Sequence, residues 1–406
     1  MRNRFLLAFL LPLASALVAQ TYVVDAANGP GSQFTDLPAA VAAVPDGATL
    51  LVRPGAYGPI DLNGKGMTIV GGPGVMLNGL LAPAIQVRNL AVHQSFSLRG
   101  AHMGWGTSMW QVHLSNNAGR VLLQEFQYSN STSPYLAGFG VPPPSAIRVD
   151  NCAQVLLHGC SIRANNAVDA VGSSLDIDGC TLAGTGTTTI IYHNPAFAGT
   201  PGLRLANCSV RLAASSVTGG PGALPTLPPS VAVQMSGSLV FLGANSTLTA
   251  GTPIGFSASV AAMSGSGTLV RDPQSTLVAA GGANVVSGSI ASSQRPWPSV
   301  TSDGGRVGMN AQATVRGAVG ELAMLFVSFP AAATSYPQVQ GPIWLEGGNL
   351  QLVALGVQSS TVPVAFNANM PNLAALAGRP RAWQAVSWSS QHGLQASNTS
   401  MFVLLP

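Results

Sequence analysis

Four ionisable residues occupy repeated segments of the chain, at positions that a parallel sheet would bring together. Three segments share one pattern, with a cysteine in the same place: VLLHGCSI (155–162), LDIDGCTL (175–182) and LRLANCSV (203–210). Aligned on that pattern, Asp176 should lie beside Arg204, and His158 should lie beside Asp178, each pair one repeat apart. Carboxylates, an imidazole and a guanidinium on a single face are the groups that acid–base catalysis or uronate binding would use.

The same pattern also has an interpretation without chemistry. Opposite charges on stacked strands form ordinary cross-strand pairs, each of which contributes well under about 1 kcal/mol when it is exposed. Asp150, Asp176 and Asp178 make only a small acidic cluster, so the sequence predicts neither a metal site nor a cofactor. We therefore expect ordinary charge pairs on this face and keep a catalytic or ligand-binding site as the alternative.

Apolar residues alternate within the repeated segments, which is the period of a strand with one buried face. In LDIDGCTL, Leu175 and Ile177 should point inward, Asp176 and Asp178 should point outward, and Gly179 breaks the run. Cys180 and Leu182 continue the inward set after the glycine. Copies that keep one register at irregular spacing are typical of a parallel β-helix, in which the turns between strands vary in length. We expect this solenoid to occupy residues 20–292.

The cysteines are predicted to lie inside the solenoid. They are Cys152, Cys160, Cys180 and Cys208, and the alignment places the last three in one inward column. Stacked thiols can stay free and act as small buried apolar groups. A disulfide between neighbouring coils is the alternative, because a strand separation of about 4.8 Å lies within the Cα range that a disulfide permits.

The first residues have the form of a secretory signal peptide. Arg2 and Arg4 precede an apolar run, and an A-x-A sequence follows at residues 14–16. The apolar run is too short for a membrane span. We expect residues 1–19 to be removed, leaving an exported protein, secreted or held at the cell surface, with no membrane span.

Residues 34–71 carry a longer pattern, FTDLPAAVAAVPDGATLLVRPGAYGPIDLNGKGMTIVG, which predicts a capped helix, a turn and short strands. The stretch resembles the N-terminal start of proteins of the pectin lyase-like superfamily. The shared features are an F-x-x-L-x-x-A-V helix and a P-x-G-x-T-L-x-V-x-P-G-x-Y strand and turn. The resemblance implies an all-β fold, a right-handed parallel β-helix with an N-terminal capping helix.

That superfamily does not fix the chemistry, because it includes lyases, hydrolases, esterases and adhesins without activity. The N-T-D, D-D, G-H-G and R-I-K set of polygalacturonases is absent, as is the Arg-x-Pro-x-x-Arg motif of pectate lyases. We expect a protein without catalytic activity that contacts polysaccharide or a cell-surface glycan. One alternative is a polysaccharide lyase or glycoside hydrolase that acts through the four aligned ionisable residues, with calcium as a cofactor if it is a lyase. A purely structural envelope protein is the other alternative.

Long loops leave the coils at residues 129–145, 187–201 and 213–230. Aromatic rings on the first two loops could stack on sugars, or they could pack the loops onto the solenoid. The ligand-binding candidates are Tyr135, Phe139, Tyr192, Phe197 and, on a strand face, Arg99.

Residues 306–406 have a different pattern, in which short strand-like runs are separated by Gly, Pro and Asn turns. Such runs are typical of a β-sandwich, and the segment resembles the C-terminal modules of many secreted bacterial proteins. Residues 293–305 are the predicted linker.

Charged residues are scarce, at 7% of the chain with a net charge of +4, and they form no basic cluster. The sequence therefore predicts no nucleic-acid partner. It leaves the oligomeric state open.

Overall fold

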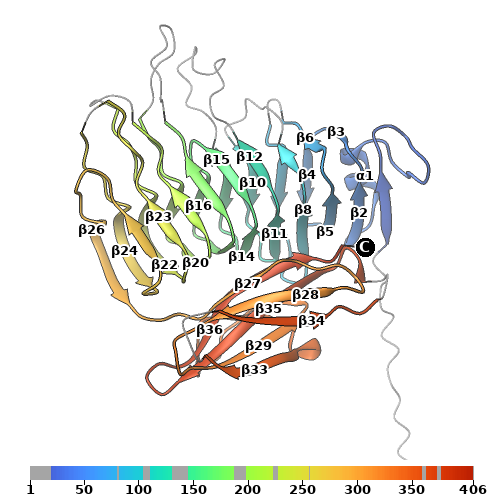
Figure 1. Ribbon diagram of the computed structural model, residues 1–406. Coiled ribbons are helices and arrows are strands. Elements are labelled where there is room, and N and C mark those ends of the chain that lie inside the picture. The colour runs from blue at the N-terminus through green and yellow to red at the C-terminus, as the bar shows by residue number, and fades with distance from the viewer. Residues whose placement is uncertain are drawn as a thin grey trace, which may run out of the picture.

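The computed structural model describes residues 20–79, 82–103, 110–129, 145–186, 198–222, 227–255, 257–358, 363–372 and 376–405. The predicted signal peptide, residues 1–19, lies outside them, as do the loop aromatics Tyr135, Phe139, Tyr192 and Phe197. The described chain forms a right-handed parallel β-helix followed by a β-sandwich, which confirms the predicted fold class (Figure 1).

The solenoid has three faces, which we number in chain order within a coil. The first face contains β4 (Ile60–Asn63), β7 (Ile85–Arg88), β10 (Trp110–Ser115), β13 (Ser145–Asp150), β16 (Val168–Val171) and β19 (Leu203–Ala206). The second face contains β2 (Ala48–Val52), β5 (Met67–Gly71), β8 (Ser95–Arg99), β11 (Arg120–Gln124), β14 (Gln154–His158), β17 (Ser174–Asp178) and β20 (Ser209–Ala213). The third face contains β3 (Gly55–Tyr57), β6 (Val75–Leu77), β9 (His102–Met103), β12 (Gln127–Ser129), β15 (Ser161–Ala164), β18 (Thr181–Gly184), β21 (Ser216–Thr218), β23 (Thr247–Thr249) and β25 (Thr276–Val278). Longer strands run from the first face onto the second: β22 (Val233–Leu242), β24 (Met263–Arg271) and β26 (Val286–Gln294).

Alternate residues of these strands fill the interior of the solenoid. Leu175, Ile177, Cys180 and Leu182 are all buried there, as the alternation predicts. Burying one Leu or Ile side chain contributes about 1.5–3 kcal/mol. Because each coil stacks on the next in register, these side chains form one continuous core along the solenoid.

The predicted capping helix closes the N-terminal end of that core. It is α1 (Leu37–Ala43), which follows β1 (Thr21–Val24) and buries Leu37 and Val41. The Asp36 carboxylate accepts a hydrogen bond from the backbone of Ala39, which satisfies one of the free N–H groups of the first turn. At the other end the Lys65 ammonium donates to the carbonyl oxygen of Val41 at 2.6 Å. This helix therefore covers an open end that would otherwise expose apolar side chains.

The predicted column of three cysteines is wrong. Cys160 and Cys180 do stack, since the backbone N–H of Cys160 donates to the Cys180 sulfur at 3.3 Å. The next position after Cys180 is Ser215, whose hydroxyl accepts from the Cys180 backbone at 3.0 Å. Cys208 belongs to a different corner, where its backbone donates to the Ser238 hydroxyl at 3.0 Å. All the cysteines are buried and free, so the disulfide alternative is not formed.

The error has a physical reason, because the corners before and after the second face use the same local structure. A residue with positive φ, such as Asn207 or Gly179, turns the chain, and Cys or Ser follows it. Asn and Gly adopt this left-handed conformation at the lowest steric cost. The segment ANCSV therefore resembles DGCTL in sequence, although it comes from the corner between the first and second faces rather than from the corner between the second and third.

The C-terminal domain is a sandwich of antiparallel sheets. One sheet contains β27 (Ser299–Ser302), β28 (Asn310–Arg316) and β34 (Val364–Asn369). The larger sheet contains β33 (Gln351–Val357), β29 (Leu322–Ser328), β35 (Pro380–Ser389), β36 (Gly393–Val403) and the short parallel strand β31 (Val339–Gln340). The remaining elements are β30 (Pro330–Thr334), β32 (Ile343–Leu345) and the 3₁₀ turn η1 (Gly347–Asn349). Trp383 and Phe402 lie in the core between the sheets. The segment predicted as a linker, 293–305, contains β27.

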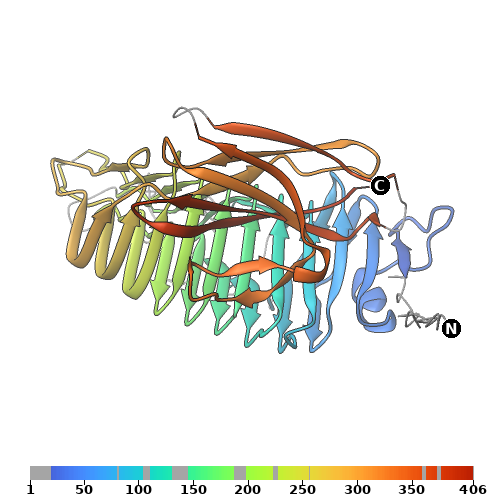
Figure 2. The same ribbon diagram turned by 90° about the horizontal axis from the view of Figure 1, so that it is seen from below.

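The sandwich lies along the second face of the solenoid, and Figure 2 shows its strands crossing those of the β-helix. The contact contains an apolar cluster in which Val70, Leu122 and Leu156 of the solenoid meet Met401 and Val403 of β36. Among the residues that the structure describes, no helix is long and apolar enough to cross a membrane.

Candidate functional site

The predicted ionisable face is the second face of the solenoid. Its outward side chains form a column in which Arg99, Gln124, His158 and Asp178 follow one another on successive strands. The predicted neighbours His158 and Asp178 are therefore confirmed. Their side chains form a pair with 2.9 Å between His158 Nδ1 and Asp178 Oδ2.

The sandwich seals this pair from solvent. Asp178 is only 2% exposed, and the Ser400 hydroxyl of β36 donates to its carboxylate at 2.5 Å. His158 is 8% exposed. A carboxylate that is already bound to an imidazole and a hydroxyl within a closed interface cannot reach a polymer chain in this structure.

The second outward column contains Asp176, but the prediction that Arg204 is its neighbour is wrong. The residue in register with Asp176 is Arg211 on β20. Arg204 lies on the first face, where its Nε is 3.2 Å from Asp169 Oδ1 and its side chain is 54% exposed. The correction follows from the misaligned third repeat, which shifted one face onto its neighbour.

Asp176 is also part of the interface with the sandwich. Its Oδ2 accepts a hydrogen bond of 3.2 Å from the backbone N–H of Thr399. Burial raises the pKa of the Asp176 carboxyl, while the positive charge of Arg211 and the hydrogen bonds from Thr399 act in the opposite direction. On the far side, Arg211 donates to the carbonyl oxygen of Ser397 at 3.4 Å. Both side chains thus bind the backbone of β36.

Arg99, predicted to bind a ligand, makes the same kind of contact. Its Nη1 donates to the carbonyl oxygen of Val403 at 2.8 Å, and its Nη2 binds Glu125 at 2.8 Å. The side-chain oxygen of Gln124 accepts from the backbone of Val403 at 2.8 Å. The sequence contained one signal of this burial, since Leu122 and Leu156 stand in an outward column where solvated residues would be polar.

Two pockets flank the seam between the domains. The larger, of 820 Å³, lies at the carboxyl ends of the second-face strands and is lined by Arg99, Glu125, His102 and, from the sandwich, Arg306. Glu125 is 46% exposed there, although Arg99 already binds it. At this pocket, ionisable groups next to the second face meet solvent.

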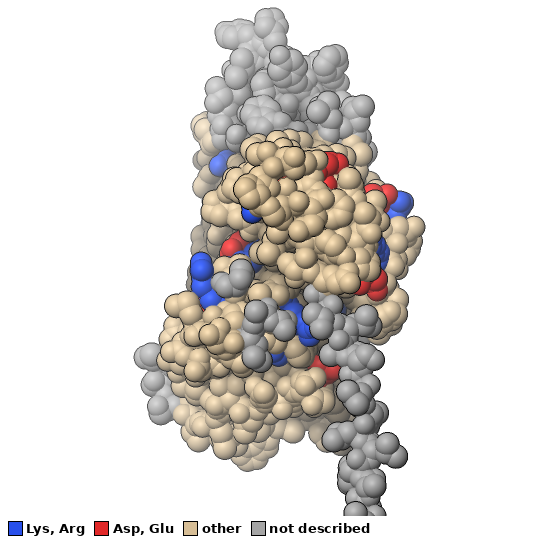
Figure 3. Space-filling view, turned by 90° about the vertical axis from the view of Figure 1, so that its right-hand side faces the viewer, with Lys and Arg blue, Asp and Glu red and all other residues tan. Residues whose placement is uncertain are grey.

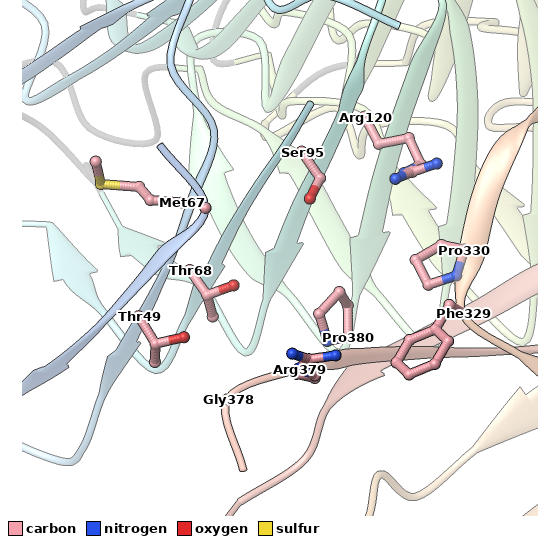
Figure 4. A pocket seen from close by; sticks show the side chains of 11 residues that line it. Thr49, Met67, Thr68, Ser95, Arg120, Phe329, Pro330, Gly378, Arg379 and Pro380 are labelled. Atoms are coloured by element: carbon pink, nitrogen blue, oxygen red, sulfur yellow. The ribbon is translucent and has the colours of Figure 1, made fainter. Parts of the chain in front are cut away.

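The smaller pocket, of 280 Å³, lies at the other edge of the seam (Figure 4). The solenoid contributes Thr49, Thr68, Ser95 and Arg120, and the sandwich contributes residues that include Phe329, Gly378, Arg379 and Pro380. Arg381 packs over the ring of Phe329 with 3.8 Å between the guanidinium carbon and the ring centre. In Figure 3, which views this end of the molecule, Lys and Arg atoms lie where the solenoid meets the sandwich.

Burial affects two of these arginines. It lowers the pKa of Arg120, an effect that the negative charge of Glu346 partly offsets. It also lowers the pKa of Arg381, and the neighbouring charge of Arg379 acts in the same direction. Sequence reasoning missed this pocket because its two walls are more than 200 residues apart in the chain. Within the described ranges there is no group of three or more His, Cys, Asp or Glu side chains that could hold a metal ion.

No family model matches the sequence, and no curated protein matches it. Among solved structures, the chain is similar to the enzymatically active domain of tailspike protein 2 of bacteriophage CBA120, with a TM-score of 0.33, 10% identity and coverage of 88% of this chain and 72% of that one. It is also similar to pectate lyase Pel9A, with a TM-score of 0.29, 14% identity and coverage of 65% and 78%. The Dettilon tailspike protein gives a TM-score of 0.23, 9% identity and coverage of 79% and 87%. At these values the similarities add nothing to the fold described above.

Proposed function

We propose that this chain is an exported protein without catalytic activity, whose β-helix and docked sandwich together contact polysaccharide or a cell-surface glycan. The observation that supports the absence of catalysis is the burial of the predicted acid–base groups. Asp176, Asp178 and His158 are each at most 8% exposed, and β36 binds both carboxylates. In this arrangement they fasten one domain to the other.

The seam between the domains supports contact with a polymer. It runs along the solenoid, and pockets of 820 and 280 Å³ open on its two edges. Both pockets carry arginines and hydroxyl or amide side chains, which are donors suited to the oxygen atoms of sugars. A rigid solenoid would hold each pocket in a fixed position beside an extended chain.

An enzyme that degrades polysaccharide is the second candidate, and the larger pocket is the observation that favours it. Glu125 and His102 both line this pocket, and both are exposed. A carboxylate and an imidazole in an open pocket are the groups required for general acid–base chemistry.

The test is a screen of the chain without residues 1–19 against acidic and neutral polysaccharides. Unsaturated products and reducing ends are measured together, with calcium and with a chelator, beside retention of the protein on each immobilised polymer. We expect retention on at least one polymer without turnover. Turnover that Glu125→Gln abolishes, at an unchanged melting temperature, would establish the enzyme instead. The absence of both retention and turnover would favour a structural envelope protein.

A further inference from the structure

The smaller pocket carries positive charge but is lined by no carboxylate, although the charge of Glu346, outside the lining, acts on Arg120. Arg120 and Arg379 line it, Arg381 lies behind Phe329, and no Asp or Glu is among its lining residues. Within the described part of the chain, none of these three guanidinium groups forms an ion pair. Several other arginines do have carboxylate partners at 2.6–3.2 Å: Arg53, Arg88, Arg99, Arg148 and Arg204.

One hydrogen-bond donor of Arg120 is unsatisfied. Its Nε is buried and has no hydrogen-bond partner among the described residues. A charged donor that loses water without gaining a partner is destabilising. Glu346 acts on Arg120 through its charge but forms no ion pair with it. An oxyanion in the pocket would supply the missing acceptor and a negative charge in direct contact, because guanidinium groups bind carboxylates and phosphates strongly.

The neutral donors around Arg120 fit the same ligand. Thr49 and Thr68 are in register on neighbouring strands, and Ser95 begins the next strand along. Figure 4 shows the three hydroxyls and the guanidinium groups of Arg120 and Arg379 around one space. Hydroxyl groups arranged in this way can donate to the anion or to the ring oxygens of a sugar that carries it.

The size of the pocket limits the ligand to one sugar unit. Its volume of 280 Å³ suits a small ligand such as a sugar ring with one acidic substituent. The pocket is also below the usual range for sites that enclose larger ligands, about 300–1,000 Å³. A longer chain would have to leave through the open side.

We propose that the pocket between Arg120 and Arg379 is an anion-binding site, which takes a carboxylate or phosphate group carried on a sugar. The inference deepens the proposed function by naming the class of glycan, but the anion site can be tested without it. Because Arg120 comes from the solenoid and Arg379 from the sandwich, the bound anion holds the two domains together. Ligand binding should therefore raise the stability of the docked state.

The experiment measures calorimetric affinity and melting temperature with four probes: glucuronate, glucose 6-phosphate, glucose and inorganic phosphate. The proteins are the chain without residues 1–19, Arg120→Gln, Arg379→Gln, the double variant, and Arg163→Gln. Arg163 is the matched control, because it is an exposed arginine on the third face of the solenoid. We expect glucuronate or glucose 6-phosphate to bind and raise the melting temperature, and glucose to do neither. Each pocket variant should lose about tenfold in affinity, since one charge-assisted hydrogen bond is worth roughly 1.4 kcal/mol or more.

A second readout separates binding from structure. Without ligand, Arg120→Gln should unfold at the same or a higher urea concentration than the parent, because it removes a buried Nε donor that has no partner. A lower midpoint would identify Arg120 as structural and overturn the proposal. So would the absence of a response to every anionic probe, or equal responses in the parent and the double variant. A response to inorganic phosphate that exceeds both sugar anions would overturn the assignment to a sugar.

The outcomes also distinguish this inference from the proposed function. Retention on polysaccharide with no response to any anion would refute the anion site and leave the proposed function intact. An arginine-dependent response to anions, without retention on any polymer, would support the anion site and refute the proposed function.

Discussion

The burial of Asp178 leads to a prediction about the loss of its carboxylate. In Asp178→Ala, the imidazole of His158 and the hydroxyl of Ser400 lose their common partner inside the interface. If the residue only fastens the sandwich to the solenoid, the change should reduce stability and nothing else. If it were catalytic, the change should abolish a reaction and leave stability nearly unaffected.

The size of the effect follows from the two contacts. A hydrogen bond to a charged group contributes about 1.5–3 kcal/mol, and removing one partner of a buried charged network costs about 3–5 kcal/mol. With Asp178 only 2% exposed, water cannot replace the carboxylate without opening the interface. We therefore expect Asp178→Ala to lose about 3–5 kcal/mol, and Ser400→Ala to lose about 1.5–3 kcal/mol as one hydrogen bond to the carboxylate is removed.

The chain contains a control in Asp61. Its carboxylate lies 2.6 Å from Nη2 of Arg88, and its side chain is 54% exposed on the first face. Since an exposed ion pair of this kind contributes at most about 1 kcal/mol, Asp61→Ala should change stability little. Urea unfolding followed by tryptophan fluorescence is the assay, because Trp297, Trp344 and Trp383 are buried in or beside the sandwich. Equal losses in the two variants would refute the role assigned to the interface.

Three further predictions concern other buried polar groups. Burial raises the pKa of Asp176 in the folded protein above its ordinary 3.8. The protonated carboxyl therefore stabilises the folded protein fully below the pKa of the unfolded state, and this stabilisation is lost as the pH rises through the pKa of the folded state. The stability of Asp176→Asn relative to the parent should therefore increase from about pH 4 upward, and urea midpoints that keep a constant difference across pH would contradict this. All 4 cysteines are buried, and burial raises the pKa of Cys152, Cys180 and Cys208, so no thiol should react with Ellman's reagent in the native protein. All 4 should react after unfolding without reductant. Fewer than 4 would indicate a disulfide. Asn117→Ala should lose about 2–3 kcal/mol in urea unfolding, because the fully buried amide binds the backbone of both Leu90 and Val87, and the exposed Asn63→Ala should serve as a near-neutral control.

The solenoid could be predicted because its information is local and repeated. The alternation around Leu175 and Ile177 sets which side chains point inward, and the pairing of His158 with Asp178 follows once two coils are aligned. The capping helix could be predicted for the same reason, since Asp36 and the apolar residues after it lie within one short segment.

The parts that could not be predicted depend on features that periodicity does not record. The predicted position of Arg204 was wrong because the corners before and after the second face share a residue of positive φ followed by Cys or Ser. The covering of the second face was not predicted, because it depends on β36, which is far from the solenoid strands in sequence. Leu122 and Leu156 indicated that something covers this face, but nothing in their own segments indicated what.

The separation between β36 and its contacts also determines the order in which the molecule can be assembled. His158 and Asp178 are 20 positions apart in the chain, whereas Thr399 binds Asp176 across 223 positions and Val403 binds Gln124 across 279. Short loops close before long ones, and a chain emerging from the ribosome presents its earlier segments first. The β-helix can therefore stack coil by coil while Leu122 and Leu156 remain exposed to solvent. Until β36 arrives, the nascent protein carries an apolar strip that favours aggregation, which makes the last stage of synthesis the vulnerable one.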